Sequence, residues 1–576
     1  MPLRIALLLL LFVMPRCGSL SPGHAELIVH NGVIWTADAG RPTAEAAAIA
    51  EGRFVAVGRD SEVLRLRGPA TRMIDLGGAF VVPGFSDNHT HFASAARFLE
   101  FNVMTAGTQE ELVEKVRGLV ADLPPGEWIV GGYWGAYDQW ARGSPGGARR
   151  EPFTPDMQQI EALTRDHPVF IRKFDDSEFA ANSAALRAAG VDPANPSASG
   201  VEFAGNGILR GPGVPALFRD AVPRSFSRER RVRQTRNALA EIRKHGVTTI
   251  SDMSDDEQLE IFRALHREGE LTVRVHFRYP LERWGELAAR GIRVGSGDAW
   301  IRLGALKGHI DGIMGNSTAR FFQPYDHDPS NRGRWRPLMV DERGEVVEGK
   351  FLQFMLDADA AGLQLTVHAI GDEANHVLLN HLEELHRRNG ARDRRFRLVH
   401  AQVLAPADFP RLGRLGAIAE VQPFHLSDDM RWMEERIGNR RSRGAYAFRS
   451  IASSGAMLTF GSDWPGTSAA EYPINPMLGL YAAVARQTIA GEPPGGWFPE
   501  QRMRIEEALR AYTWNSAYAN FEERERGSIE VGKLADLAVL SRNLLEISAR
   551  EILDTEVLHT IIDGRVVYSR EERAGR

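Results

Sequence analysis

Two histidines separated by one residue follow an apolar segment and a Pro-Gly bend. The segment from Val81 to His91 reads Val-Val-Pro-Gly-Phe-Ser-Asp-Asn-His-Thr-His. On an extended strand, residues two apart point to the same side, so His89 and His91 would present both imidazoles to one point. Neutral imidazole is a common ligand for zinc. Because such a pair also occurs by chance or on a solvated strand face, the interpretation depends on the rest of the chain.

Four further residues that can bind a metal stand at the ends of apolar segments: Lys307, His368, His400 and Asp463. Each also has a purely structural interpretation. The lysine could form a buried salt bridge, the two histidines could be hydrogen-bonded core residues, and the aspartate could cap a turn. Taken together they indicate one metal centre, provided that the fold brings them to the same place.

Segments of β character alternate with stretches of helical composition through the middle of the chain. After the first strand, the candidate strands are Val247–Ile250, Leu271–Phe277, Ile301–Lys307, Leu365–Ala369, Phe396–Ala401, Ala417–Gln422 and Met457–Phe460. Eight parallel strands with helical crossovers predict an α/β fold, a (β/α)8 TIM barrel. Such barrels carry their chemistry at the carboxyl ends of the strands, so the six candidate ligands are expected on one face.

The two ends of the chain share short strands punctuated by glycine. We predict that residues 26–80 and 520–570 form one β-sandwich built from both termini, beside a barrel domain of residues 81–510. Residues 100–243 follow the first barrel strand and are predicted to form an insertion over the barrel mouth. The alternative is that some strands of this insertion belong to the barrel.

The first 25 residues have the pattern of a secretory signal peptide. Arg4 precedes an apolar run from Ile5 to Met14, too short to span a bilayer, with a candidate cleavage site after Ala25. A buried first strand or helix is the alternative. Cleavage would remove Cys17, the only cysteine of 576 residues, so a metal in the exported protein would have nitrogen and oxygen ligands. The net charge of −5 gives no reason to expect nucleic acid, or membrane after cleavage, as a partner.

Several motifs occur together and in order along the chain. They are Pro-Gly-Phe-x-Asp-x-His-Thr-His at Pro83, Lys-x-x-x-Asp-Gly at Lys307, Val-His-Ala-Ile-Gly-Asp at Val367, His-Ala-Gln at His400, Gln-Pro-x-His at Gln422, Gly-Ser-Asp-Trp-Pro at Gly461, Asn-Pro at Asn475 and Gly-Lys-x-Ala-Asp at Gly532. In this combination the chain resembles the amidohydrolase superfamily, specifically its third amidohydrolase family.

The resemblance implies a centre with two zinc ions. His89 and His91 would bind one ion, which Asp463 completes, and His368 and His400 would bind the other. Lys307 would bridge the two as an N-carboxylated lysine, whose carbamate is an anionic oxygen donor. Manganese and iron are not excluded, and a single-metal version stays open if Lys307 is unmodified.

The resemblance also implies hydrolysis of an amide-like bond in a small-molecule substrate. A metal-activated hydroxide would attack the carbonyl while Asp463 acts as general base and then as general acid. Asp311, Arg320 and His425 are expected to orient substrate or the surroundings of the ligands; their alternatives are surface ion pairs and structural hydrogen bonds. The family often carries a histidine where Ser177 stands, which leaves the substrate open.

Two other functions remain as alternatives. A deaminase or lactone-opening relative would share the fold, but superfamily deaminases tend to carry a glutamate where this chain has Gly371. An exported binding or regulatory protein without catalysis would be expected to have lost ligands, whereas all six are present. The state of assembly is open, with a homodimer among the alternatives.

Overall fold

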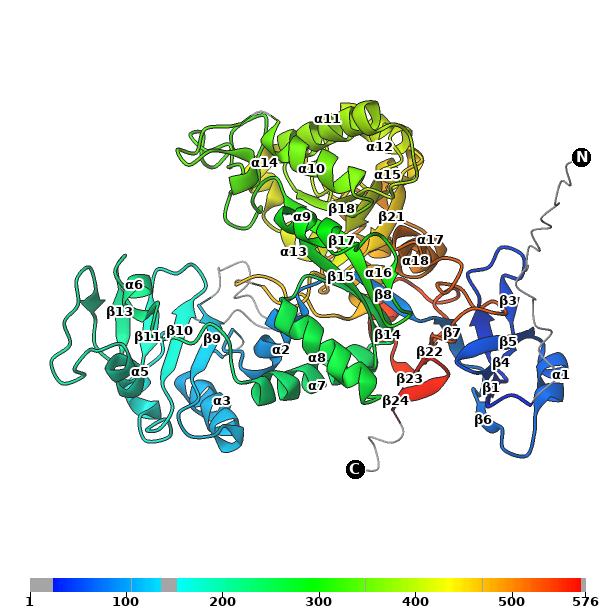
Figure 1. The fold of residues 1–576 in the computed structure, drawn as a ribbon, viewed down its shortest axis with the longest axis horizontal. Helices are drawn as coiled ribbons and strands as arrows, with labels where there is room; N and C mark the ends of the chain where they lie inside the picture. The colour runs from blue at the N-terminus through cyan, green and yellow to red at the C-terminus, as the bar shows by residue number, and fades with distance from the viewer. Residues whose placement is uncertain (1–23, 105, 136–152, 348, 469, 571–576) are drawn as a thin grey trace, which may run out of the picture.

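A barrel of eight parallel strands forms the centre of the molecule (Figure 1). The computed structural model describes residues 24–104, 106–135, 153–347, 349–468 and 470–570. In order around the barrel, the strands are β8 (Phe85–Thr90), β14 (Val247–Asp252), β15 (Arg274–Pro280), β17 (Ile301–His309), β18 (Gln364–Ala369), β19 (Arg397–His400), β20 (Ile418–Val421) and β21 (Met457–Phe460). This confirms the predicted fold class and the eight strands expected from the sequence.

The first and last strands meet at a seam near the carboxyl end of the barrel. The Asp463 amide donates to the carbonyl of His89 at 2.8 Å, and the His91 amide donates to the carbonyl of Trp464 at 2.9 Å. Deeper in the seam, Asn88 Nδ2 donates to the carbonyl of Phe460 at 2.8 Å. The seam therefore fixes three of the predicted ligands relative to one another through the backbone.

Several barrel strands are buried along their whole length beneath the surrounding helices. All six residues of β18 and all four of β19 and β20 are buried. Strands covered on both faces read as nearly continuous apolar runs, which is why the sequence identified them. The polar exceptions, among them His368, Arg397, His400 and Glu420, lie buried and need partners there.

Helices surround the barrel between the strands. Those in and around the barrel are α2 (Phe92–Glu100), α7 (Arg228–Lys244), α8 (Asp256–Arg267), α9 (Trp284–Ala289), α10 (Lys350–Ala360), α11 (Asp372–Asn389), α12 (Phe409–Arg414), α13 (Pro423–Asp429), α14 (Met433–Ser442), α15 (Phe448–Ser453), α16 (Pro476–Ala485), α17 (Ile505–Tyr512) and α18 (Trp514–Ala519). The sequence around helix α8 explains where that helix begins. Asp255 caps its N-terminus by accepting a hydrogen bond from the Gln258 amide at 2.8 Å. Its apolar side, with Leu259, Phe262 and Leu265, is buried in the main core.

Both ends of the chain build the β-sandwich at one end of the barrel (Figure 1). One sheet has β5 (Arg53–Gly58), β4 (Ala46–Ala50), β1 (Leu27–His30) and β6 (Arg72–Asp75) in that order. The other has β24 (Arg565–Ser569), β23 (Val557–Ile562), β22 (Leu537–Leu540), β7 (Phe80–Pro83), β2 (Val33–Trp35) and β3 (Thr43–Ala44). Strand β7 thus lies between strands from the two ends of the chain, and it leads directly into β8.

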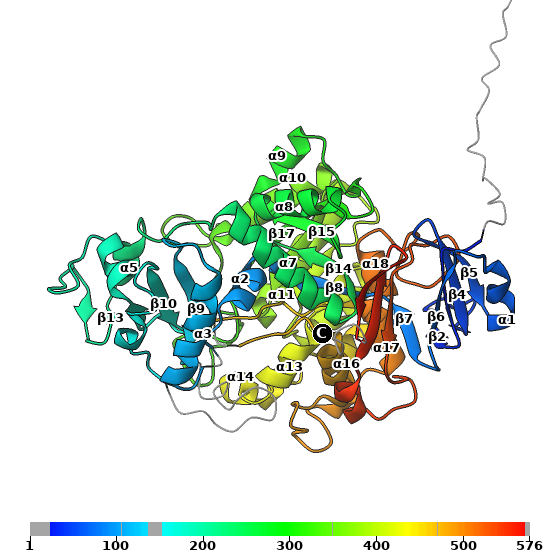
Figure 2. The ribbon, with the colours of Figure 1, turned by 90° about the horizontal axis from the view of Figure 1, so that it is seen from below.

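The insertion has its own sheet and lies at the opposite end of the barrel from the sandwich, as both ribbon views show (Figure 2). Its strands are β12 (Glu202–Phe203), β13 (Ile208–Arg210), β11 (Phe179–Ala181), β10 (Val169–Lys173) and β9 (Ile129–Trp134) in sheet order, with helices α3 (Gln109–Asp122), α5 (Ser183–Ala188) and α6 (Val214–Phe218). None of these strands joins the barrel sheet, so the alternative assignment falls away for the residues that the structure describes.

The end of the insertion differs from the boundary expected at residue 243. Helix α7 packs against α2 and β14 of the barrel, and Arg230 at its start also donates to the carbonyl of Trp128 in the insertion at 2.7 Å. Its buried face, with Ala238, Leu239 and Ile242, belongs to the main core. A helix at this place is the crossover that a parallel strand requires, so the inserted part ends before Arg228.

The predicted signal peptide lies almost entirely outside the described residues. At its expected cleavage point, Ala25 is buried and its amide donates to the carbonyl of Leu66 at 2.9 Å. Throughout the described parts of the chain, no helix combines the length and the apolar character needed to cross a membrane.

Candidate metal centre

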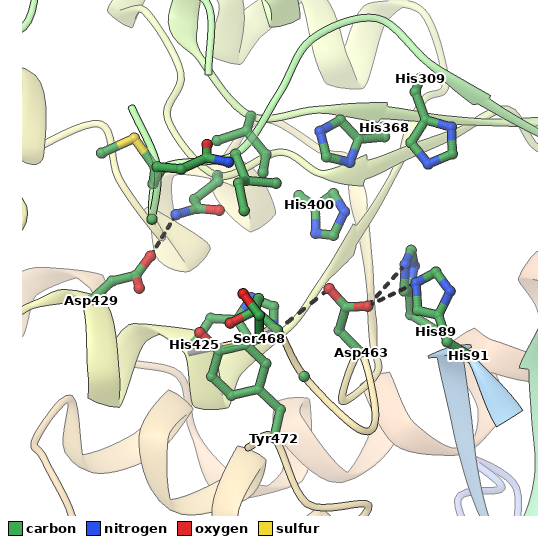
Figure 3. Close-up of a pocket in the computed structure, with 18 of the residues that line it drawn as sticks. His89, His91, His309, His368, His400, His425, Asp429, Asp463, Ser468 and Tyr472 are labelled. Carbon is green, nitrogen blue, oxygen red and sulfur yellow. Dashed lines mark hydrogen bonds and ion pairs between the residues drawn. The ribbon is translucent and has the colours of Figure 1, made fainter. Parts of the chain in front are cut away.

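A cavity of about 450 Å³ opens at the carboxyl end of the barrel strands (Figure 3). Six predicted ligands and one predicted substrate residue line it: His89, His91, Lys307, His368, His400, Asp463 and His425. They come from β8 and the residue that follows it, β17, β18, β19, the segment after β21 and helix α13. Residues from six places in the chain therefore face one space.

Three of these residues form a compact set of donor atoms. His89, His400 and Asp463 each offer one nitrogen or oxygen, and all three atoms lie within 4.8 Å of one another. Asp463 Oδ1 lies 3.5 Å from His89 Nε2 and 3.2 Å from His91 Nε2 (Figure 3). Lys307 Nζ lies 3.3 Å from His89 Nε2, so the lysine reaches the same point.

His368 stands beside this set with a different arrangement of its ring. The centres of the His368 and His400 rings are 4.5 Å apart. His368 Nε2, however, lies 2.9 Å from the carbonyl oxygen of Gly312 and 3.4 Å from Asp311 Oδ1. The structure thus places His368 in the cavity wall with one ring nitrogen engaged by the loop after β17.

Burial sets the protonation of the centre. It lowers the pKa of His89 to about 3, which leaves a neutral imidazole with a free lone pair at neutral pH. Burial would raise the pKa of Asp463, but His89 and a hydrogen bond from His91 hold that pKa well below its usual range. Burial lowers the pKa of Lys307 to about 7. Neutral imidazoles and a carboxylate are donors that suit a divalent metal.

Glu420, which the sequence did not point to, accepts a hydrogen bond from the His89 ring nitrogen that faces away from the cavity. Its Oε1 lies 2.7 Å from His89 Nδ1, so Nδ1 carries the proton and Nε2 faces the cavity. Arg278 and Arg397 pair with the same carboxylate at 2.8 and 2.6 Å. A glutamate inside the apolar strand Ile418–Val421 was the available signal, because a buried carboxylate needs partners.

His309 is a second residue that the sequence analysis missed. It lines the cavity, and its ring centre lies 5.3 Å from that of His368. It stands two residues after Lys307 on β17, so strand alternation sends both side chains to the same side. The spacing is the one that identified His89 and His91.

The three expected substrate residues have different positions. His425 lines the cavity and stacks on Tyr472, with ring centres 3.9 Å apart. Asp311 is fully buried and accepts the amides of Arg320 and Gly371 at 2.9 Å and of Ile370 at 3.1 Å. Arg320 pairs with Glu373 at 2.8 Å. Neither Asp311 nor Arg320 is among the residues that line the cavity; their contacts join the loops around His368, which is the second of the two roles expected from the sequence.

The insertion supplies part of the cavity rim. Phe174, Asp175 and Asp176, directly after β10, line it. Ser468 Oγ donates to the carbonyl of Phe174 at 2.8 Å, which ties this rim to the loop after β21.

Gly371 has a steric reason to be glycine. A Cβ atom at this position would lie 1.9 Å from the carbonyl oxygen of Arg320, which is backbone and has no room to move. No side chain fits there without displacement of the loop, so a glutamate of the deaminase type has no place at residue 371.

Comparison with known proteins decides the family. A sequence profile of the amidohydrolase family matches residues 72–568. The chain belongs to the amidohydrolase family. This amidohydrolase is 32% identical over 573 residues to "Protein LONG AFTER FAR-RED 3" of Arabidopsis thaliana, covering 94% of this chain and 92% of that protein. It is 25% identical to N-substituted formamide deformylase of Arthrobacter pascens, covering 95% and 98%.

Solved structures agree with this assignment. An uncharacterized metal-dependent hydrolase from Pyrococcus horikoshii superposes with a TM-score of 0.71 at 25% identity, covering 91% of this amidohydrolase and 99% of that chain. The family, this structural neighbour and the cluster of His89, His400 and Asp463 together support hydrolase activity with a divalent metal.

Proposed function

We propose that this amidohydrolase cleaves the carbon–nitrogen bond of a non-peptide amide, with Asp463 moving the proton. The observation that carries the proposal is the convergence of His89, His400 and Asp463 within 4.8 Å, at a cavity that also contains Lys307 and His91. The likeness to N-substituted formamide deformylase supports the choice of an amide.

The donor set would hold one or two divalent ions. His89, His91 and Asp463 would hold the first ion, and His368 and His400 the second, with N-carboxylated Lys307 between them. We favour zinc, since imidazole and carboxylate suit it, while manganese and iron accept the same donors. An ion bound there would polarise the substrate carbonyl and lower the pKa of water.

Asp463 is placed to act as proton acceptor and then donor. One of its oxygens faces His89 and His91, while the other lies 3.9 Å from His425 Nε2. It would take the proton of the attacking water and return it to the leaving nitrogen. Glu420 keeps His89 in one tautomer during these steps, because its carboxylate accepts a hydrogen bond from the Nδ1–H group.

Asp463→Asn tests this assignment. The variant loses the proton acceptor, so we expect kcat to fall by about 10²- to 10⁴-fold on any amide that the protein hydrolyses. Substrates would be N-formyl amines, N-acyl amino acids and cyclic amides, with metal content measured by mass spectrometry for each preparation. Asp175→Asn, at the exposed rim, is the matched control and should keep its activity.

Two results would overturn the proposal. Metal-replete protein that opens lactones or releases ammonia, and leaves every amide intact, would indicate another member of the superfamily. Metal-replete protein without any hydrolysis would indicate a binding or regulatory role. Full activity of Asp463→Asn with bound metal would remove Asp463 from the proton transfer.

We also propose that the protein is exported and acts on small molecules after loss of its signal peptide. Cleavage directly after Ala25 would remove a buried residue whose amide donates a hydrogen bond to the carbonyl of Leu66. A cut a few residues earlier therefore preserves the fold better. Mass spectrometry of the mature N-terminus tests this, and an intact Met1 in the mature protein would contradict export.

Gel filtration with light scattering would show whether the protein is a homodimer.

A further inference from the structure

A second carboxyl group faces the cavity opposite the proton-transfer residue. Asp429, the last residue of α13, lines the cavity on the side away from Asp463, His89 and His91 (Figure 3). The residue is only 5% exposed. Because Asp429 lies across the cavity, the proposed chemistry at the metal centre does not use it.

Two donors hold Asp429 through the same oxygen. Gln402 Nε2 and the Tyr446 hydroxyl both donate to Asp429 Oδ2 at 2.6 Å. The Tyr446 amide also donates to the carbonyl of Gln402 at 2.8 Å, so the two donors are fixed to each other. Among the described residues, no hydrogen bond reaches Oδ1, and this oxygen is not one of the fully buried atoms that lack a partner, so it is accessible from the cavity that Asp429 lines.

Two cations near Asp429 or in the cavity wall, Arg436 and Arg336, donate to backbone carbonyls. Arg436 lies close enough to lower the pKa of Asp429, but its Nη1 donates to the carbonyls of Met314 and Gly315 at 2.5 and 2.8 Å. Arg336, another cation of the cavity wall, donates to the carbonyl of Asp311 at 3.0 Å. These backbone contacts leave Asp429 Oδ1 without a cationic hydrogen-bond donor among the described residues.

We propose that Asp429 is a specificity-determining residue that binds a protonated amine of the substrate, remote from the bond that is cleaved. This rests on the proposed amide hydrolysis and names its substrate class: amides that carry a second, cationic nitrogen. Oδ2 is held by Gln402 and Tyr446, while Oδ1 accepts the ammonium group. Because the carboxylate is already oriented, little rotamer freedom is lost when the substrate binds.

Matched substrates test the contact. Mono-N-formyl diamines with four, five and six methylenes would be compared with N-formyl alkylamines in which a methyl group replaces the ammonium. Burial raises the pKa of Asp429 to about 7, with Tyr446, Gln402 and Arg436 acting against that rise and Tyr472 near the carboxylate. The comparison is therefore made at pH 8, where Asp429 is ionised and the ammonium keeps its proton.

We expect the wild-type protein to prefer the ammonium member of the best pair by about 10- to 100-fold in kcat/KM, the range of a charge-assisted hydrogen bond. Asp429→Asn should abolish this preference with little effect on the neutral member and on metal content. Asp175→Asn removes an exposed carboxylate of the rim and should change the preference by less than about 3-fold. The wild-type preference is measurable even if the Asp429 variant does not fold.

Several results would overturn the inference. They are equal kcat/KM for both members of every pair, an equal loss on both members in Asp429→Asn, or an equal loss of preference in Asp175→Asn. If no amide is hydrolysed, the proposed function fails by itself. Calorimetric binding of the same pairs then decides the inference: about 10-fold weaker binding of the ammonium member to Asp429→Asn supports it, and unchanged binding overturns it.

Discussion

Glu420 connects two buried arginines of the barrel interior to the candidate metal centre. Its side chain is fully buried and pairs with Arg278 and Arg397, whose side chains are also fully buried. Its Oε1 also fixes His89. One carboxylate thus balances two cations and orients a predicted ligand, which links the stability of the barrel to the geometry of the metal centre.

Glu420→Gln should therefore be strongly destabilising. The substitution keeps the shape but leaves two buried guanidinium groups without a counter-charge, so we expect the free energy of unfolding to fall by about 3–5 kcal/mol. Denaturant unfolding of both proteins measures the difference. Glu270→Gln breaks an exposed pair with Arg236, whose side chains are 45% and 49% exposed, and should cost less than about 1 kcal/mol. Similar small losses for both variants would contradict the prediction.

Residue types and spacing predicted much of the candidate centre but little of the cavity wall. His89, His91 and Lys307 stand at strand ends, where local sequence tells which side a side chain takes. His309 was within reach of the same reasoning. Asp429 was not, because its role depends on Gln402 and Tyr446, which tertiary packing brings to it. Asp311 was singled out by its place after a strand, but the sequence could not choose between its two expected roles, because its three backbone partners lie in loops distant in the chain.

At the scale of elements, helix α11 contains a histidine that makes the fold sensitive to acid. His381 stacks on Phe351 of α10 with ring centres 6.2 Å apart, and its Nδ1 is buried without a hydrogen bond from the described residues. Burial lowers the pKa of His381 from 6.5 to about 4. The unfolded chain thus binds this proton more readily, and stability is lost as the pH falls from about 6.5 towards 4.

His381→Phe should remove this share of the acid sensitivity. At pH 7, His381 is mostly neutral in the folded and in the unfolded wild-type protein. At this pH we therefore expect the substitution to change the free energy of unfolding only by the small effect of repacking. At pH 5 the wild-type protein should have lost about 2 kcal/mol of unfolding free energy that the variant keeps. Denaturant unfolding at the two pH values gives this difference. Parallel losses in both proteins would show that His381 does not titrate in this range.

The sequence predicted barrel strands well where a short apolar run stood alone. The apolar runs of β14 and β21 gave strands close to the observed limits. The boundary expected at residue 243 differs from the structure, since α7 looks like part of the insertion in sequence but packs on α2 and β14. Whether a helix covers one sheet or another is decided by contacts between distant segments, and local sequence does not contain them.

At the scale of the whole molecule, one buried ion pair joins the barrel to the sandwich. Arg274 of β15 donates through Nε and Nη2 to the two carboxylate oxygens of Asp536 at 2.7 and 2.9 Å. The two residues are 2% and 6% exposed. Asp536 directly precedes β22, so the pair anchors the C-terminal strands to the barrel.

Arg274→Met should loosen the sandwich. It leaves Asp536 as a buried carboxylate without its cation, so we expect a loss of about 3–5 kcal/mol and faster proteolysis between the barrel and β22. The double variant with Asp536→Asn should recover part of the loss, because no unpaired charge remains. Denaturant unfolding and limited proteolysis measure both effects. Additive losses in the double variant would contradict a direct pairing.

The seam between β8 and β21 has a consequence for when the protein can take up its ion. The Asp463 amide donates a hydrogen bond to the carbonyl of His89 at this seam. Because residue 463 comes late in the chain, this contact can form only after the ribosome has made most of the protein. A chain translocated before that contact forms would complete the pair in its destination. The cation pool of that compartment, and not that of the site of translation, would then decide which metal the enzyme carries.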